Sequence, residues 1–266
     1  MVVGRVTPTT VTRVRHGDGS TTTEQVDDVL VVEEPLSIQL DGRLVATTMR
    51  TPGHDFELAA GFCFTDGLLA GAPVTGVRYV AGPDRSVHVD NAVTVDTDGR
   101  APEPRPRLGN VSSSCGWCGS DQIDDLCLRL GPLDPSPSIG LDVLATVPAA
   151  VRARQELFDV TGAVHAAAVF DREGRIIVVR EDVGRHNAVD KVIGSMLLDG
   201  RLPLRDRGLY VSGRASIEMV QKAWSAGLAT LLAESAPTAL AVESARRADM
   251  TLVGFLRADG FNVYSS

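Results

Sequence analysis

The sequence predicts an α/β protein with a mixed β-sheet, divided into two domains. From residue 160 onward, short apolar runs alternate with amphipathic stretches, which is the pattern of strands and helices packed in layers. Asp41-Gly42 separates two runs with strand character, and such a hairpin favours a mixed rather than a purely parallel sheet. Residues 97–110 contain three prolines and two glycines, which is a linker composition. We therefore expect a smaller α+β domain at 1–108 and a larger α/β domain at 109–266.

The N-terminal domain is expected to combine strands with one buried helix. Residues 1–25 are rich in Thr, Arg and Gly and predict an exposed arm with strand character. Residues 55–69 are almost wholly apolar, so they predict a buried helix in which Cys63 packs as a core residue. The other strands of this domain are predicted at 36–40, at 43–49 and, as two short strands, within 74–95.

The C-terminal domain is expected to begin with a loop and one helix and then to alternate regularly. A helix is predicted from Ser120 to Leu130, because apolar residues at helical spacing follow a favourable N-cap. A second helix is predicted to start at Thr146-Val147-Pro148 and to run to Phe158. Further strands are predicted at 164–170, 175–179, 208–212, 230–233, 252–256 and 261–264, and further helices at 187–198, 216–226 and 237–248.

Composition and charge exclude several classes of protein. The chain has 266 residues, of which 44% are hydrophobic and 23% charged, an ordinary composition for a soluble globular protein. Its net charge of −8 argues against nucleic-acid binding, which needs a basic face. No apolar run reaches the ~18 residues of a membrane helix, and no basic-then-apolar signal opens the chain. We therefore expect a cytoplasmic protein that binds neither nucleic acid nor membrane.

A pair of cysteines, Cys115 and Cys118, is the main candidate for chemistry. The pair lies in a polar segment with three serines before it and Gly-Ser after it, which is typical of a loop. A thiol just before a helix N-terminus tends to have a lowered pKa, and the thiolate is the reactive form. Acidic residues at 121, 124 and 125 oppose that lowering. The loop is therefore a site where a moderately activated thiolate is expected.

The cysteine pair alone leaves several functions open. A structural zinc site usually needs two such pairs, and the sequence has no second one. A thioredoxin-like dithiol lies between a strand and a helix, whereas this pair follows a proline-rich linker. A sulfur carrier would take up a sulfur atom on one thiolate as a persulfide, and the second thiol could release it. Two surface cysteines without a function are the remaining alternative.

His165 raises a further alternative, because it opens an apolar strand. It is either a core histidine or a ligand or general acid facing a pocket. Zinc nucleobase deaminases combine His-x-Glu with Pro-Cys-x-x-Cys. Here Ala167 replaces the glutamate, Ser114 replaces the proline, and the cysteine pair precedes the histidine. Deamination is therefore not expected, although the fold could be related.

Two polar strand–helix junctions are candidate binding sites. Residues 180–187 carry six polar side chains, and Glu181, Asp182, Arg185 and His186 could hold a ligand unless the segment is only a solvated loop. Residues 211–216 form the second junction. Its Gly213 allows close approach of the backbone, its Arg214 offers a bidentate cation, and a helix N-terminus follows, so the junction is a plausible anion or phosphate site.

Six segments together resemble the sulfurtransferase family that is accessory to formate dehydrogenase, the FdhD sulfur carriers. The segments lie at 51–62, 115–119, 164–168, 181–191, 211–216 and 251–257. The resemblance implies a three-layer α/β/α C-terminal domain with a cytidine-deaminase-like mixed sheet. It also implies a cytoplasmic homodimer that receives sulfur from a cysteine desulfurase as a persulfide on Cys115, assisted by Cys118. The sulfur would pass to the molybdenum bis(molybdopterin guanine dinucleotide) cofactor, which formate dehydrogenase needs.

The resemblance also implies where the cofactor binds. The expected contact stretch consists of Phe255, Leu256, Arg257, Ala258, Asp259 and Gly260. To it we add the two polar junctions, because the cofactor carries phosphates: Ser212, Gly213, Arg214, Arg185 and His186. No structural metal is expected. A cofactor-binding chaperone without sulfur chemistry and a dithiol oxidoreductase remain the alternative functions.

Overall fold

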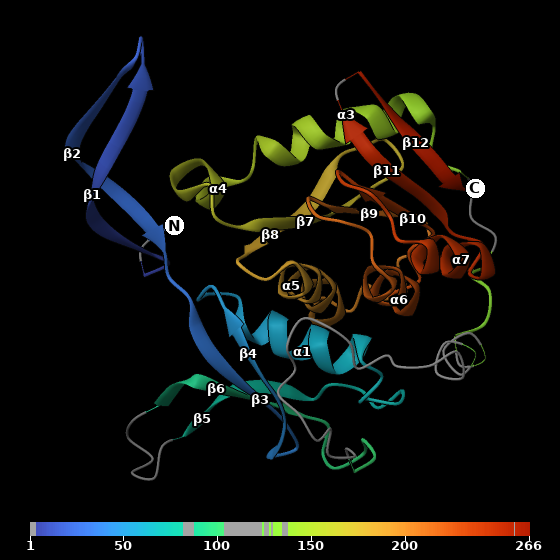
Figure 1. The fold of residues 1–266 in the computed structure, drawn as a ribbon. Coiled ribbons are helices and arrows are strands. Elements are labelled where there is room, and N and C mark those ends of the chain that lie inside the picture. The colour runs from blue at the N-terminus through green and yellow to red at the C-terminus, as the bar shows by residue number, and fades with distance from the viewer. Residues whose placement is uncertain are drawn as a thin grey trace.

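The computed structural model describes residues 4–81, 88–103, 124, 128, 130–134, 138–257 and 259–266. Figure 1 shows a layered molecule in which helices cover both faces of one sheet, and a second, smaller sheet lies beyond one of these helix layers. A two-stranded ribbon projects from this body. The fold is thus a mixed α/β fold with three sheets.

The larger sheet has six strands in the order β12-β11-β10-β9-β7-β8. The strands are β7 (His165–Phe170), β8 (Ile176–Asp182), β9 (Gly208–Val211), β10 (Thr230–Ala233), β11 (Thr251–Arg257) and β12 (Gly260–Ser265). β9, β10 and β11 pair in parallel, whereas β7 is antiparallel to both of its neighbours and β12 is antiparallel to β11. The prediction of a mixed sheet is confirmed.

Helices cover both faces of this sheet because its strands are apolar on both sides. One face carries α5 (Arg185–Leu198), α6 (Ile217–Ser225) and α7 (Ala239–Arg247), and the other carries α3 (Leu141–Arg152) and α4 (Glu156–Thr161) (Figure 1). Neighbouring residues of a strand point to opposite faces. Thus Leu231 packs in the core cluster of α5 to α7, and Leu232 packs in that of α3.

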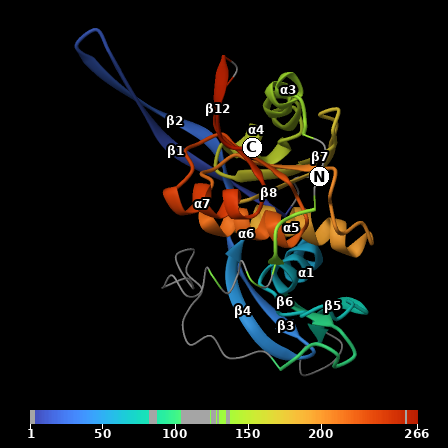
Figure 2. The same cartoon turned by 90° about the vertical axis from the view of Figure 1, so that its right-hand side faces the viewer.

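The smaller sheet and one buried helix make up most of the N-terminal half. The sheet has the order β4-β3-β6-β5, built from β3 (Glu34–Leu40), β4 (Arg43–Arg50), β5 (Gly76–Ala81) and β6 (His88–Asp96). The predicted hairpin of β3 and β4 around Asp41-Gly42 is confirmed, and both turn residues have positive φ. Helix α1 (Asp55–Thr65) lies between this sheet and α5 (Figures 1 and 2).

Helices α1 and α5 cross at two glycines. A Cβ atom on Gly61 would collide with the carbonyl oxygen of Asp190, and one on Gly194 would collide with the carbonyl oxygen of Glu57. The two backbones therefore meet without side chains between them. This crossing joins the N-terminal half to the layered C-terminal half.

The projecting ribbon consists of β1 (Val6–Gly17) and β2 (Ser20–Val31), which pair along their whole length (Figures 1 and 2). The predicted strand character of the N-terminal arm is confirmed, but the arm extends to residue 31. The sequence analysis missed the turn at Asp18-Gly19, where both residues have positive φ.

The outer edge of β8 is occupied by arginine side chains. The outward carbonyl oxygens of Ile176, Val179 and Glu181 accept hydrogen bonds from three guanidinium groups. The donors are Arg154 at 2.8 Å, Arg180 at 2.9 Å and Arg5 at 3.3 Å, respectively. An edge strand normally offers such groups to another strand, so these bonds protect it.

Three element boundaries predicted from the sequence are wrong. The helix predicted at 146–158 is two helices, because Pro148 lies inside α3 rather than in its first turn. Helix α1 ends at Thr65 instead of residue 69, because the following segment turns at residues with positive φ such as Gly67. Strand β8 continues to Asp182 and α5 starts at Arg185, so only two residues connect them.

Some expectations fall on residues that the structure does not describe. These are the domain boundary at 108, the cysteine pair at 115 and 118, and most of the helix predicted at 120–130. Within the described ranges, no helix is long and apolar enough to span a membrane.

Candidate functional site

Most of the predicted binding residues meet at one edge of the six-stranded sheet. The carboxyl ends of β8, β9, β10 and β11 lie at this edge, together with the amino end of β7, because β7 runs the opposite way. His165, Arg185 and the segment 212–214 therefore converge from three neighbouring elements, and 255–257 comes from the far end of the same edge. Ligands of open α/β sheets bind at such carboxyl ends.

Backbone hydrogen bonds join the loops along this edge. The Ser212 N–H donates to the Ala166 carbonyl at 3.0 Å, and the Thr238 N–H donates to the Ala215 carbonyl at 3.0 Å. The Phe255 N–H donates to the Ser235 carbonyl at 3.2 Å. The loops are thus held in fixed positions relative to one another.

His165, Ser212, Gly213 and Arg185 form the most compact cluster of the edge. The Ser212 hydroxyl oxygen accepts the Ala166 N–H at 3.0 Å and lies 3.4 Å from Nδ1 of His165. A Cβ atom on Gly213 would lie 3.6 Å from Cδ of Arg185 and 3.7 Å from Nδ1 of His165. Burial, and then the positive charge of Arg185, lower the pKa of His165 below its usual value. The imidazole is therefore neutral at neutral pH.

The guanidinium group of Arg185 has an unused donor. Its Nε atom is buried and has no hydrogen-bond partner among the described residues, although the residue as a whole is half-buried. Leaving a buried donor unpaired costs ~1–3 kcal/mol, and more for a charged group. An anionic ligand would satisfy this donor.

His186 is held neutral next to Arg185. Burial lowers the pKa of His186 to about 4, and the positive charges of Arg185 and Lys222 contribute. Glu218 and Asp66 oppose this shift, so the imidazole also interacts with α6 and with the end of α1. Its environment is therefore shared between the sheet edge and the helix layer.

The remaining predicted contacts differ in accessibility. Arg214 is exposed. Phe255 is 45% exposed and has φ 53°, a left-handed conformation that is rare for an aromatic residue and is often found at functional sites. Leu256 is buried in the core beneath α3, so only its backbone can reach a ligand. Arg257 donates to the Glu234 carbonyl at 2.6 Å. Asp259 and Gly260 are exposed, and Ala258 lies outside the described residues.

Glu181 and Asp182 have structural roles instead of free ligand-binding groups. The Glu181 carboxylate accepts the N–H groups of Leu157 and Phe158 at 2.9 and 2.8 Å, which caps the start of α4. Asp182 forms a fully buried ion pair with Lys191 at 2.7 Å. These two residues of the first polar junction are therefore used in folding.

Sequence reasoning missed the polar network around this ion pair. The Lys191 ammonium donates to the Thr51 carbonyl at 2.9 Å, and the Asn187 amide donates to the Met49 carbonyl at 2.7 Å. Asn187 and Lys191 lie in the polar segment that carries the family resemblance, but their partners are more than a hundred residues away. Only the spacing of polar residues inside an apolar helix could have indicated them.

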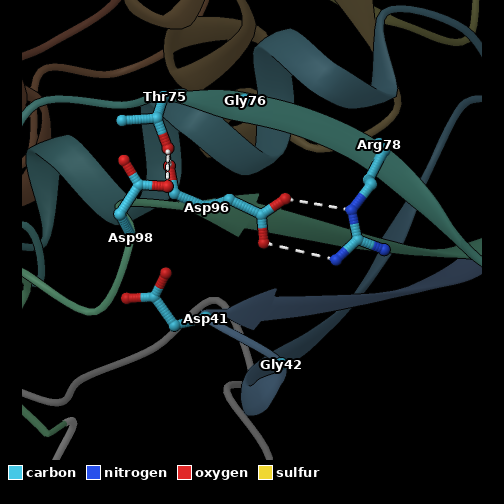
Figure 3. A pocket seen from close by; sticks show the side chains of 7 residues that line it. All are labelled: Asp41, Gly42, Thr75, Gly76, Arg78, Asp96 and Asp98. Carbon is cyan, nitrogen blue, oxygen red and sulfur yellow. Dashed lines mark hydrogen bonds and ion pairs between the residues drawn. The ribbon is translucent and has the colours of Figure 1, made fainter.

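An acidic hollow in the smaller sheet is not a ligand site (Figure 3). Asp41, Asp96 and Asp98 line it, but each carboxylate already has a partner. Asp96 pairs with Arg78 at 3.0 Å, Asp98 accepts the Thr75 hydroxyl at 3.1 Å, and Asp41 accepts the Thr97 N–H at 2.7 Å. Across the described residues, no group of three or more His, Cys, Asp or Glu side chains could hold a metal ion.

The cysteines can be judged only in part. Cys63 is fully buried in the core of the smaller sheet, and burial raises the pKa of its thiol, so its predicted packing role is confirmed. Cys115 and Cys118 lie outside the described residues. Their proximity to the edge cluster is therefore a matter of proposal.

The fold and the edge define a class: mixed α/β proteins whose strand ends present arginine and neutral histidine side chains to an anionic ligand. The family model described as the FdhD/NarQ family matches residues 31–266. The chain therefore belongs to the FdhD/NarQ family.

Similar proteins extend over nearly the whole chain. The sulfur carrier protein FdhD of Corynebacterium efficiens is 46% identical over 254 residues, covering 90% of this chain and 89% of that protein. That of Streptomyces avermitilis is 46% identical, covering 99% and 95%. A crystal structure of a proposed formate dehydrogenase accessory protein from Desulfotalea psychrophila has a TM-score of 0.72, 24% identity and coverage of 98% and 97%. That structure supports the fold.

Proposed function

We propose that this protein is a sulfur carrier for the molybdenum cofactor of formate dehydrogenase. Its relatives bear the name of sulfur carriers, and the Cys115-Gly-Trp-Cys118 segment supplies a thiol for the task. The observation that carries the acceptor side is the unpaired Nε donor of Arg185 beside Gly213. A protein of net charge −8 must bind an anionic cofactor through such local groups.

The loading step is a thiol–persulfide exchange. The Cys115 thiolate attacks the outer sulfur of a persulfide on a cysteine desulfurase. A sulfur–sulfur bond forms on Cys115, the corresponding bond of the donor breaks, and the donor cysteine leaves as a thiolate. One neutral sulfur atom moves, so no external oxidant or reductant is needed. Cys118 is the assisting thiol that promotes release of the sulfur.

The acceptor is the bis(molybdopterin guanine dinucleotide) cofactor, which is a substrate here. Arg185, His186 and the segment 212–214 would contact its phosphates, and the stretch 255–260 would contact the rest of the nucleotide. The fit rests on the unpaired donor of Arg185 and on the open space above Gly213. Within this proposal the protein is a cytoplasmic homodimer, works with a cysteine desulfurase and a formate dehydrogenase, and has a cytidine-deaminase-like C-terminal sheet.

Intact mass after incubation with a cysteine desulfurase and cysteine tests the proposal. The wild-type protein should gain the mass of one sulfur atom, and Cys115→Ala should not. Cys63→Ala is the matched control, because Cys63 is fully buried, and it should load like the wild type. A wild type that never gains sulfur contradicts the proposal.

The same materials separate the alternative functions. If Cys115→Ala still activates formate dehydrogenase, the protein is a cofactor-binding chaperone. If the wild type cycles between dithiol and disulfide at a physiological potential without taking up sulfur, it is an oxidoreductase.

A further inference from the structure

The space above Gly213 is bounded by two side chains that can bind an anion. The ring edge of His165 that contains Nδ1 and Cε1 faces this space, at 3.7 and 3.8 Å from the position of an added Cβ. The aliphatic part of Arg185 lies at 3.6 Å from the same position. A glycine here keeps the backbone low between the two side chains, which leaves room for a small ligand group.

The hydrogen bonds of Ser212 define the tautomer of His165. The Ser212 oxygen already accepts the Ala166 N–H, and in the described part of the chain the nearest acceptor for its proton is Nδ1 of His165. If Ser212 donates to Nδ1, the single ring proton of the neutral imidazole is on Nε2, the atom that follows Cε1 around the ring. His165 then presents an N–H donor and cannot present an acceptor at that position.

We infer that the space above Gly213 is a phosphate subsite, in which the Nε2–H of His165 and the Nε–H of Arg185 donate to phosphate oxygens. Ser212 is a positioning residue, because it fixes the ring through Nδ1. The subsite takes the phosphate or pyrophosphate group of a nucleotide. The nature of the nucleotide rests on the proposed function, whereas the geometry of the subsite does not.

Gly213→Ala is the most direct probe of this subsite. The added Cβ would lie at ordinary van der Waals distance from its neighbours, and Gly213 does not have a left-handed φ, so the fold accommodates alanine. The methyl group would nevertheless occupy the space where a phosphate oxygen is placed. Gly17→Ala on the ribbon is the matched control, because nothing lies within 4 Å of its added Cβ.

Calorimetric titration with inorganic pyrophosphate, guanosine diphosphate and guanosine tests the inference. We expect Gly213→Ala and His165→Leu to bind pyrophosphate and guanosine diphosphate about tenfold more weakly or worse than the wild type. His165→Gln should fall between, because its amide restores a donor near Nε2. Gly17→Ala and His16→Gln should bind like the wild type. Guanosine, which lacks phosphate, should be insensitive to Gly213→Ala.

Two results would overturn the subsite: a wild type that does not bind pyrophosphate, or a Gly213→Ala variant that binds both phosphate ligands unchanged. Neither result affects persulfide loading, which tests the proposed function separately. If binding of pyrophosphate depends on Gly213 but guanosine diphosphate binds no better than pyrophosphate, the subsite stands and the guanine-nucleotide acceptor fails.

Nitrogen-15 chemical shifts of His165 provide an independent readout. The proton should be on Nε2 in the free protein, and the Nε2 signal should shift when pyrophosphate is added. In Ser212→Ala the ring should lose its single tautomer even if the protein folds normally. A proton on Nδ1 in the wild type contradicts the inference.

Discussion

At the scale of single residues, the ion pair of Asp182 and Lys191 is the most consequential contact. Both side chains are fully buried, and burial lowers the pKa of Lys191 although Asp182 opposes the shift. We expect Lys191→Met to lower the free energy of unfolding by ~3–5 kcal/mol, because it leaves the Asp182 carboxylate buried without its counter-ion. Urea unfolding at neutral pH measures this loss.

Arg175 offers a matched control for that prediction. Its side chain is 75% exposed and pairs with Asp171 and Glu173. Exposed pairs contribute ~0–1 kcal/mol, so Arg175→Met should change the unfolding free energy by no more than that. Equal effects of Lys191→Met and Arg175→Met would mean that the buried pair has no special role.

His186 should make stability depend on pH. Its pKa is about 4 in the folded protein and ~6.5 in an unfolded chain. The folded state favours the neutral imidazole, so the unfolded state binds more protons between these values. The stabilising effect is complete above ~6.5 and is lost as the pH falls towards 4, with a slope of up to ~1.4 kcal/mol per pH unit.

Urea midpoints measured across this pH range should therefore fall more steeply for the wild type than for His186→Gln. The exposed His16, whose Nδ1 lies 3.0 Å from the Thr21 hydroxyl oxygen, serves as the control. His16→Gln should keep the wild-type slope. A His186→Gln variant with an unchanged slope would contradict the assignment.

The candidate site could be predicted residue by residue only in part. The sequence indicated Arg185 and Gly213, because each follows an apolar strand, and the structure brings them together with His165. It suggested Glu181 and Asp182 as ligands, because both are charged and stand at a strand end. Their partners lie at distant positions such as Leu157 and Lys191, and such pairings cannot be read from local sequence.

At the scale of elements, the crossing of α1 and α5 depends on Gly61 and Gly194. An alanine at either position would push a methyl group into the backbone of the facing helix. We expect Gly61→Ala and Gly194→Ala each to destabilise the protein by ~1–3 kcal/mol or more. Because both substitutions separate the same two helices, the double variant should lose less than the sum of the single losses.

Thermal unfolding of the two variants checks this prediction. Gly17→Ala introduces the same methyl group into open space and should unfold like the wild type. Additive losses in the double variant would show that the two glycines act at independent contacts.

The sequence predicted elements well where one local signal decided the structure. The Asp41-Gly42 turn and the apolar strands at 208–212 and 230–233 are examples, and the observed strands differ by one residue at most at these places. The ribbon was missed in part, because its Thr-rich strands have little apolar alternation. The last residues of β8 were taken for a loop, because their polar side chains are satisfied by distant partners.

At the scale of the whole molecule, the two halves should unfold together. Fully or nearly fully buried polar contacts join them, among them Lys191 with Thr51 and Lys222 with Thr65, at 2.9 Å each. We expect one calorimetric transition whose enthalpy equals the van't Hoff enthalpy. Two transitions, or a smaller van't Hoff enthalpy, would show that the halves are stable independently.

The arginine side chains along β8 have a consequence for behaviour at high concentration. A bare strand edge can recruit the same strand of another molecule and begin a fibril. Here Arg5, Arg154 and Arg180 occupy the carbonyl groups that such growth requires. Arg154→Leu should therefore increase light scattering in concentrated solution before it changes the melting temperature. By this means the chain can keep a six-stranded sheet with an unpaired last strand and still resist aggregation.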